Sequence, residues 1–273
     1  MLNAFSIVVP ALNEQDTIGE ILCVLQDLTD DLIVVDGHST DSTVAIASKS
    51  GAKVVQDNGL GKGDAVRVGL ANARQPITVF VDADGSHDLN DIPKLVQPIL
   101  SGQADLVMGS RMLGGSEELF GSIYEVARLM GSLVISLSIN YRYGVRFTDY
   151  QNGFRAIRTE VGRSIGLRSN ITTIEQEMAM RCLRYGYRVI EVPTHEYRRK
   201  GGSSKIRVMR VAHVYIWNLI SNLIKPNKSI LNRDSSKNSP LPFKISLPGS
   251  TSSYSGSPSR SVCPICNSPL DEG

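Results

Sequence analysis

Residues 77–88, ITVFVDADGSHD, join a short apolar run to two carboxylates, Asp82 and Asp84, that are separated by one small residue. Residues two apart in an extended chain project to the same side, so both carboxylates can face one ligand. Ala83 and Gly85 leave space beside them for a hard divalent ion and a second ligand. Acidic pairs also occur where strands end or helices are capped. The stretch therefore predicts a buried strand followed by a candidate site for a divalent cation.

Residues 5–108 alternate short apolar runs with helical patterns. The runs FSIVVP, DLIVVD, AKVVQD, ITVFVD and DLVMGS have the composition of strands. This alternation is typical of an α/β fold with a mostly parallel sheet flanked by helices. Right-handed crossovers place the loops that follow parallel strands at one edge of the sheet. The polar residues of this region fall in those loops, which predicts a binding crevice lined by Asn13, Glu14, Asp36, Asp41, Lys62, Asp82, Asp84, Ser110 and Arg111.

The composition is that of a globular enzyme. The chain has 273 residues, of which 41% are hydrophobic, and a formal net charge of +2. This is enough apolar material for a full core, and no global field favours nucleic acid as a partner. The first ten residues lack the positive and apolar regions of a secretory signal. Cys23 and Cys182 lie in apolar helical patterns and the cysteines do not suggest a disulfide framework, so we expect a cytoplasmic protein.

Two long segments, residues 119–143 and 206–224, are amphipathic and carry basic residues. Each could be a core helix or a helix that lies at a membrane surface with its cations at the level of the lipid headgroups. Neither offers the roughly 18 uninterrupted apolar residues that a bilayer-spanning helix requires. We therefore expect one domain over residues 1–226 that is peripheral on the cytoplasmic face of a membrane.

Residues 227–273 are rich in Ser, Pro, Asn and Lys and show no periodicity, so we expect a disordered tail. Near its end, Cys263 and Cys266 resemble one half of a zinc ribbon. A tetrahedral Zn²⁺ site needs four ligands, so a second chain or a protein partner would have to complete it. The alternative is an unliganded pair in a flexible tail.

Two polar turns in the first half have the composition of nucleotide-binding loops. Residues 34–43, VVDGHSTDST, place Asp36 at a strand end, where a carboxylate can bond a ribose or a base. The same residues would also form a well-capped turn without any ligand. In residues 59–66, GLGKGDAV, the glycines let backbone amides approach a ligand while Lys62 supplies positive charge. This loop is too short for a Walker loop, which disfavours ATP hydrolysis of that type.

Taken in order, these motifs resemble the family-2 glycosyltransferases with a GT-A fold, and among them the polyprenol (dolichyl) phosphate mannosyltransferases and glucosyltransferases. The likeness spans about residues 5–210. It is carried by Pro10 with Asn13 and Glu14, residues 36–43, Gly-Lys-Gly at 61–63, Asp82 with Asp84, GSR at 109–111, DYQNGFRAI at 149–157, EQEMAM at 175–180 and RKGGSSK at 199–205.

The resemblance implies a role for each matched residue. Mg²⁺ or Mn²⁺ would be held by Asp82, Asp84 and, through water, Ser86. The nucleotide-sugar donor would be bound by Pro10, Asn13, Glu14, Asp36, Gly37, Ser39, Lys62, Asp82 and Ser204. The catalytic groups would be Asp82, Asp84, Asp149, Arg199 and Lys205. The phosphate of a lipid acceptor would be bound by Arg111, Arg128 and Ser132, the last two lying on one helical face.

The implied reaction is an inverting, metal-dependent transfer of a hexose from GDP-mannose or UDP-glucose to a polyprenyl phosphate. The negative charge that develops on the leaving nucleotide can be stabilised by a divalent ion and nearby cations. A lipid phosphate is already anionic and needs no general base. A hydroxyl acceptor, as in polysaccharide assembly, would need one, and Asp149, Glu175 and Glu177 are the candidates. A non-catalytic scaffold of the same fold is disfavoured by the intact carboxylates and cations.

Three positions depart from the common pattern of that family. Gly37 stands where many members have a second acid, Leu12 where many have an aromatic residue, and Ser86 where the mannosyltransferases commonly have Gln. The choices between guanine and uracil and between mannose and glucose therefore stay open. His38 and His87 could approach the diphosphate, but a lone histidine in a loop is more often a polar surface residue, and we interpret both in that way.

Overall fold

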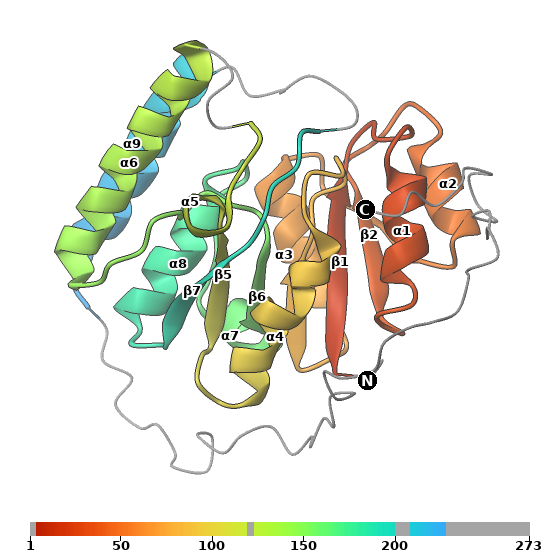
Figure 1. Cartoon of the computed structure of the whole chain (residues 1–273), viewed down its shortest axis with the longest axis horizontal. Helices are drawn as coiled ribbons and strands as arrows, with labels where there is room; N and C mark the ends of the chain where they lie inside the picture. The colour runs from red at the N-terminus through yellow and green to blue at the C-terminus, as the bar shows by residue number, and fades with distance from the viewer. Residues whose placement is uncertain (1–3, 119–122, 200–207, 228–273) are drawn as a thin grey trace, which may run out of the picture.

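The computed structural model describes residues 4–118, 123–199 and 208–227, which form a seven-stranded sheet with helices on both faces (Figure 1). The strands are β1 Phe5–Ala11, β2 Leu32–Asp36, β3 Lys53–Gln56, β4 Ile77–Phe80, β5 Leu106–Ser110, β6 Arg155–Arg158 and β7 Val189–Pro193. The helices are α1 Ile18–Leu25, α2 Thr43–Lys49, α3 Lys62–Asn72, α4 Ile92–Leu100, α5 Arg111–Gly114, α6 Ile123–Tyr143, α7 Thr159–Ser164, α8 Ile174–Arg184 and α9 Val208–Leu223, with a 3₁₀ turn η1 at Leu89–Asp91.

The strand order is β3-β2-β1-β4-β6-β5-β7, and every pairing is parallel except those that β6 makes with β4 and β5. The predicted mostly parallel α/β sheet and its five predicted strands are confirmed. Two strands were not predicted, β7 and β6; the four residues of β6, RAIR, lack an apolar run. Arg155 is nevertheless buried, since its guanidinium donates to the backbone carbonyls of Tyr150, Asn152 and Glu175.

Burial on both faces explains why the central strands are almost wholly apolar. All residues of β2, β4 and β5 are buried. One face packs against α1, α2 and α4, and the other packs against α3, α7 and α8. The result is a three-layer arrangement whose loops are free to form a site at the sheet edge.

The order in which the chain adds strands to the sheet reverses between β1 and β4, which pair in parallel. The chain runs from β1 outward to β2 and β3, and then returns to place β4 on the other side of β1. In wound sheets a ligand crevice forms outside the carboxyl ends of the strands at such a switch point. The loops after β1 and β4 therefore lie where the sequence predicts the site.

Helices α6 and α9 lie side by side at the margin of the domain beyond α8 (Figure 1). Ile135, Ile139 and Leu219 bury one side of this pair in the core. Its outer side exposes Leu137 at 67% and Trp217 at 71% of their surfaces. Within the described residues, neither these helices nor any other is both long and apolar enough to span a bilayer.

Candidate active site

The centre of the site is a lysine held between two carboxylates. Lys62 is the first residue of α3, Asp82 follows β4, and Glu175 lies in the first turn of α8. The Lys62 Nζ atom lies 2.6 Å from Asp82 Oδ1 and 3.1 Å from Glu175 Oε1. Residues far apart in the sequence thus meet at the carboxyl edge of the sheet, as the switch point requires.

The three charges determine one another's protonation. Burial alone would lower the pKa of Lys62, but the two carboxylates raise it above its usual range. Burial alone would raise the pKa of Asp82, but Lys62 and Arg199 lower it well below its usual range. Burial raises the pKa of Glu175, and the attraction of Lys62 and Arg155 offsets only part of that effect. Lys62 is therefore a cation and Asp82 an anion at neutral pH.

The cluster of Lys62, Asp82 and Glu175 has room to form because two neighbouring positions are glycine. A Cβ atom at Gly153 would lie 2.6 Å from Asp82 Oδ2 and 2.9 Å from Lys62 Nζ, so any larger residue would displace the ion pair. Gly63, the residue after Lys62, lies against the backbone of Ser169, where a Cβ would overlap the carbonyl oxygen. These two glycines explain why α3 can begin at the centre of the site.

The second carboxylate of the predicted pair is held by an arginine and a serine. Asp84 Oδ2 lies 3.2 Å from Arg199 Nε, and Asp84 Oδ1 accepts a 2.7 Å hydrogen bond from the Ser86 hydroxyl. Arg199 also lies 3.5 Å from Glu118. Arg199 therefore connects the loop after β4 with the segment that follows β7.

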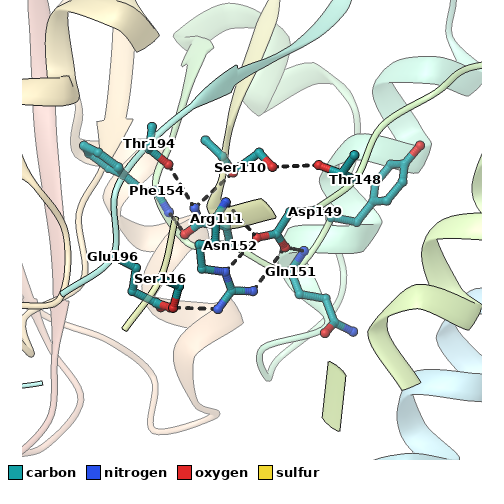
Figure 2. Close-up of polar contacts among 12 residues, drawn as sticks. Ser110, Arg111, Ser116, Thr148, Asp149, Gln151, Asn152, Phe154, Thr194 and Glu196 are labelled. Carbon is teal, nitrogen blue, oxygen red and sulfur yellow. Dashed lines mark hydrogen bonds and ion pairs between the residues drawn. The ribbon is translucent and has the colours of Figure 1, made fainter. Parts of the chain in front are cut away.

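Arg111 lies at the centre of a separate polar cluster (Figure 2). Its guanidinium makes a two-point contact with Asp149, at 2.6 and 3.1 Å, and a 3.3 Å contact with Glu196. The Ser116 hydroxyl donates to the other oxygen of Glu196. Burial alone would raise the pKa of Asp149, but Arg111 lowers it below its ordinary value. Two carboxylates, Asp149 and Glu196, compensate the charge of Arg111. Its guanidinium therefore attracts a phosphate less strongly than the sequence alone suggests.

A cavity of about 380 Å³ connects these clusters with the helical pair. At one end it is bounded by Lys62, Asp82, Glu175, Arg111 and Arg199. Its other walls are contributed by α6 and α9, through Gly131, Ser132, Val134, Ile135, Tyr215, Ile216 and Leu219. The Tyr215 hydroxyl bonds that of Thr172 at 2.5 Å, which ties α9 to the loop before α8. The space is therefore charged at one end and largely apolar at the other.

The turn after β2 is built by hydrogen bonds within the predicted donor-binding residues. Asp36 accepts bonds from the backbone N–H groups of His38 and Ser39, both at 3.1 Å. Ser39 in turn accepts from the Asn13 N–H at 2.9 Å, and Asn13 Oδ1 accepts from the Thr40 N–H at 2.8 Å. The Asp36 carboxylate is buried, and its hydrogen bonds shape the turn.

Comparisons with known proteins agree with this arrangement. The profile described as "Glycosyl transferase family 2" matches residues 6–166. "Dolichyl-phosphate hexose transferase" of Haloferax volcanii is 30% identical over 206 residues, which are 74% of this chain and 86% of that protein. The chain belongs to glycosyl transferase family 2.

Two further proteins show how far the likeness extends. "Glycosyltransferase AglJ" of Haloferax volcanii is 34% identical over 206 residues, and the match covers 74% of this chain and 65% of that protein. The glucosyl-3-phosphoglycerate synthase from Mycobacterium tuberculosis, crystallised with Mn²⁺ and UDP, superimposes with a TM-score of 0.65 at 23% identity and covers 83% of this chain and 82% of its own. That similarity confirms the predicted GT-A fold for this glycosyltransferase.

Six of the predicted site residues in the described part of the glycosyltransferase line the cavity. Those lining the cavity are Lys62, Asp82, Ser86, Arg111, Ser132 and Arg199, and Asp84 contacts Arg199. Pro10 lines a second, small cavity of about 10 Å³ that also borders Asp82 and Glu175. Glu14 donates its backbone N–H to Thr43, and the Gly37 N–H donates to the Ala11 carbonyl. Asp149 lies behind Arg111 and is 1% exposed.

Some predictions fall outside the described residues. These are the side chain of Arg128, both Ser204 and Lys205, the tail after residue 227, and the proposed Zn²⁺ ligands Cys263 and Cys266. Their roles stay predictions.

One expectation about the site was wrong, and several lining residues were not predicted. His87 is buried, and its ring stacks on Phe154 with centroids 4.6 Å apart, so it is not a surface residue. His38 is half exposed, as expected. The lining residues Glu196, Gln151, Asn152, Thr172 and Tyr215 carried no individual signal, because each reaches the cavity only through the packing of distant segments.

The donor set at Asp82 and Asp84 fits a divalent ion that is shared with a substrate. Mg²⁺ is usually bound by one or two carboxylates together with substrate phosphates and water. In the described part of the chain no third His, Cys, Asp or Glu completes a protein-only metal site. Lys62 and Arg199, which neutralise the two carboxylates, would then be close to the phosphates of that substrate.

Proposed function

We propose that this glycosyltransferase transfers a hexose, with inversion, from GDP-mannose or UDP-glucose to a polyprenyl phosphate. The observation that carries the proposal is the cavity itself, which leads from Lys62 and Asp82 to walls formed by α6 and α9. An acceptor that combines a phosphate with an apolar chain matches both ends of that space. A similarity to a dolichyl-phosphate hexose transferase supports the same substrate class.

The donor end would hold a nucleoside diphosphate. Asp82 and Asp84 would bind Mg²⁺ or Mn²⁺, which supplies a positive charge for the diphosphate leaving group. A protein of the same fold was crystallised with Mn²⁺ and UDP, which supports this assignment. Lys62 and Arg199 would stabilise the charge that develops on the same phosphates as the glycosidic bond breaks. The turn at Asn13, Asp36, Gly37 and Ser39 would hold the nucleoside through its backbone groups.

The acceptor end would hold the lipid phosphate near Ser132 and the edge of Arg111. Because Arg111 already contacts Asp149 and Glu196, it would orient this phosphate with part of its charge compensated. Gly131, Val134 and Ile216 would lie along the first part of the lipid chain. A phosphate is anionic at neutral pH and can attack the sugar without losing a proton, so the reaction needs no base.

The contacts of the three candidate bases favour a phosphate over a hydroxyl acceptor. Asp149 is engaged by both sides of the Arg111 guanidinium. Glu177 accepts from Arg181 and from the backbone N–H groups of Arg168 and Ser169, away from the cavity lining. Only Glu175 lines the cavity, and its Oε2 atom is buried with no hydrogen-bond partner among the described residues. The hydroxyl-acceptor alternative therefore depends on Glu175.

The acceptor class can be tested with purified protein, labelled GDP-mannose or UDP-glucose, and Mn²⁺. Polyprenyl phosphate and the matching polyprenol, which lacks only the phosphate, are offered in parallel. The proposal predicts an acid-labile lipid-linked sugar with the phosphate alone. Formation of product from the polyprenol or from a glycan, but not from the phosphate, would contradict it. Glu175→Gln sharpens the test, because it should abolish transfer only if a base is required.

We further propose that α6 and α9 place the enzyme peripherally on a membrane, on its cytoplasmic face. The exposed apolar side chains of this pair, including Leu137, Trp217 and Ile220, support a surface contact rather than a span. Such a contact would bring the apolar end of the cavity close to the lipid that carries the acceptor.

A further inference from the structure

His87 is fixed in one orientation beside the proposed metal ligand Asp82. Its ring lies nearly parallel to that of Phe154, at an angle of 15°, and both side chains are buried. Its backbone pairs with that of Glu196 in an isolated bridge. The imidazole therefore cannot turn away from the cavity without breaking the stack.

The hydrogen bond to its Nδ1 atom determines the tautomer of His87. The Asp82 backbone N–H donates to Nδ1 at 3.3 Å. Because an amide N–H can only donate, Nδ1 must present its lone pair, and a neutral ring then carries its proton on Nε2. The loop that places Asp82 thus also selects which nitrogen of His87 is a donor.

The Nε2–H group of His87, a residue that lines the cavity, has no hydrogen-bond acceptor among the described residues. Nε2 lies 3.9 Å from Asp82 Oδ2, which is beyond hydrogen-bond distance. No described residue accepts a hydrogen bond from it, and His87 lines the cavity together with Asp82 and Ser86. A donor fixed in this way is suited to an oxygen atom of a ligand seated against Asp82.

We propose that His87 is a donor-substrate binding residue, whose neutral Nε2–H donates to an oxygen of the sugar diphosphate. The inference rests on the proposed nucleotide-sugar donor, but not on the identity of the acceptor. The bound oxygen belongs either to the diphosphate or to a hydroxyl of the transferred hexose, and both can accept this hydrogen bond. The same ring also keeps Asp82 in place through its amide.

Two substitutions distinguish the role of Nδ1, which accepts from the Asp82 N–H, from that of Nε2, which would donate to the substrate. In His87→Asn, the side-chain oxygen can still accept from the Asp82 N–H, but no donor reaches the Nε2 position. In His87→Gln, the terminal amide places an N–H near that position. His213→Asn, an exposed histidine of α9, is the matched control.

The experiment measures the Kd of GDP-mannose and UDP-glucose by calorimetry in Mn²⁺ without acceptor, together with thermal unfolding. We expect His87→Asn to raise the Kd of the bound nucleotide-sugar about tenfold at a nearly unchanged Tm, and His87→Gln to recover most of that loss. The corresponding nucleoside diphosphates distinguish the two sources of the oxygen: an equal loss assigns it to the diphosphate, and a smaller loss assigns it to the hexose.

The inference is overturned if His87→Asn binds the nucleotide-sugar as the unsubstituted enzyme does, or if His87→Gln is no better than His87→Asn. If the unsubstituted enzyme binds neither nucleotide-sugar, the proposed function fails, and the role of His87 fails with it. If binding is normal but no sugar reaches a polyprenyl phosphate, only the acceptor assignment fails.

Discussion

The two sides of the crevice are built in opposite ways. On the donor side, the turn after β2 is closed by hydrogen bonds among its own side chains and backbone, and Asp36 is 1% exposed. On the acceptor side, α6 and α9 expose large apolar side chains next to the cavity. A turn with satisfied polar groups can form without its ligand, whereas an exposed apolar face is stabilised further when something covers it. The turn of the proposed donor side is therefore pre-formed, whereas we expect the proposed acceptor side to be covered by its surroundings.

The largest effect is expected at the donor side, from Asp82→Asn. This change removes a carboxylate charge between Lys62 and the proposed metal while keeping the size of the side chain. We expect transfer to fall about 10³-fold with little change in fold, because stabilisation of the leaving group is lost. Initial rates with saturating Mn²⁺ measure it. Asp88→Asn is the matched control in the same loop, since Asp88 caps η1 and accepts from the Tyr197 hydroxyl, and the side-chain oxygen of Asn can accept in the same way. Equal losses in both variants would contradict the assignment.

The second prediction concerns stability and the cluster of Lys62, Asp82 and Glu175. Lys62→Met leaves Asp82 and Glu175 facing each other without their shared cation, which should cost about 3 kcal/mol in the free energy of unfolding. Chemical denaturation measures it.

The double variant with Glu175→Gln provides the control for Lys62→Met. Because the amide removes one of the two unpaired charges, the double variant should be more stable than Lys62→Met alone. Additive losses would show that the three residues do not form one cluster.

A smaller effect is expected from Arg111→Lys. A lysine keeps the charge but cannot make the two-point contact with Asp149, so we expect a loss of about 2 kcal/mol in the free energy of unfolding at neutral pH. The pKa of Asp149 lies below its ordinary value of 3.8, so its pairing stabilises the fold above that pH and the contribution is lost as the pH falls through the lower, folded-state value.

The acid limb of the stability curve provides the check on Arg111→Lys. A weaker ion pair should raise the pKa of Asp149 in the folded state. The variant should therefore lose stability at a higher pH than the unsubstituted protein. An unchanged acid limb would mean that Arg111 does not control Asp149.

The smallest effect on folding, and the sharpest contrast with the donor side, is expected from Trp217→Glu. The side chain is 71% exposed, so the free energy of unfolding should change by less than about 0.5 kcal/mol. Binding to lipid vesicles should nevertheless weaken about tenfold, because a large apolar contact is replaced by a charge. Vesicle co-sedimentation measures it. Val24→Glu on α1, across the sheet, is the control, and equal effects of both changes would remove α9 from the membrane contact.

The strands and the loops after β1 and β4 could be predicted from the sequence, whereas the contacts that join distant segments around the cavity could not. Runs such as ITVFVD are buried on both faces and therefore keep a continuous apolar pattern, so the strands and the loop with Asp82 could be placed. The pairing of Lys62 with Glu175 joins α3 to α8 across 113 positions of sequence, from 62 to 175, and no local pattern encodes it. β6 was missed because Arg155 is buried with its charge satisfied by backbone carbonyls, which hydrophobic periodicity does not detect. His87 was misjudged because its partner Phe154 lies on another segment.

The most direct test of the account is whether a divalent ion and Asp82 act together in binding the donor. Calorimetric titration of the nucleoside diphosphate can be carried out with Mn²⁺, with EDTA, and with Asp82→Asn in each condition. The account predicts that Mn²⁺ tightens binding at least about tenfold in the unsubstituted enzyme and has little effect in Asp82→Asn. Equal affinity with Mn²⁺ and with EDTA, or a full Mn²⁺ effect that survives in Asp82→Asn, would contradict it.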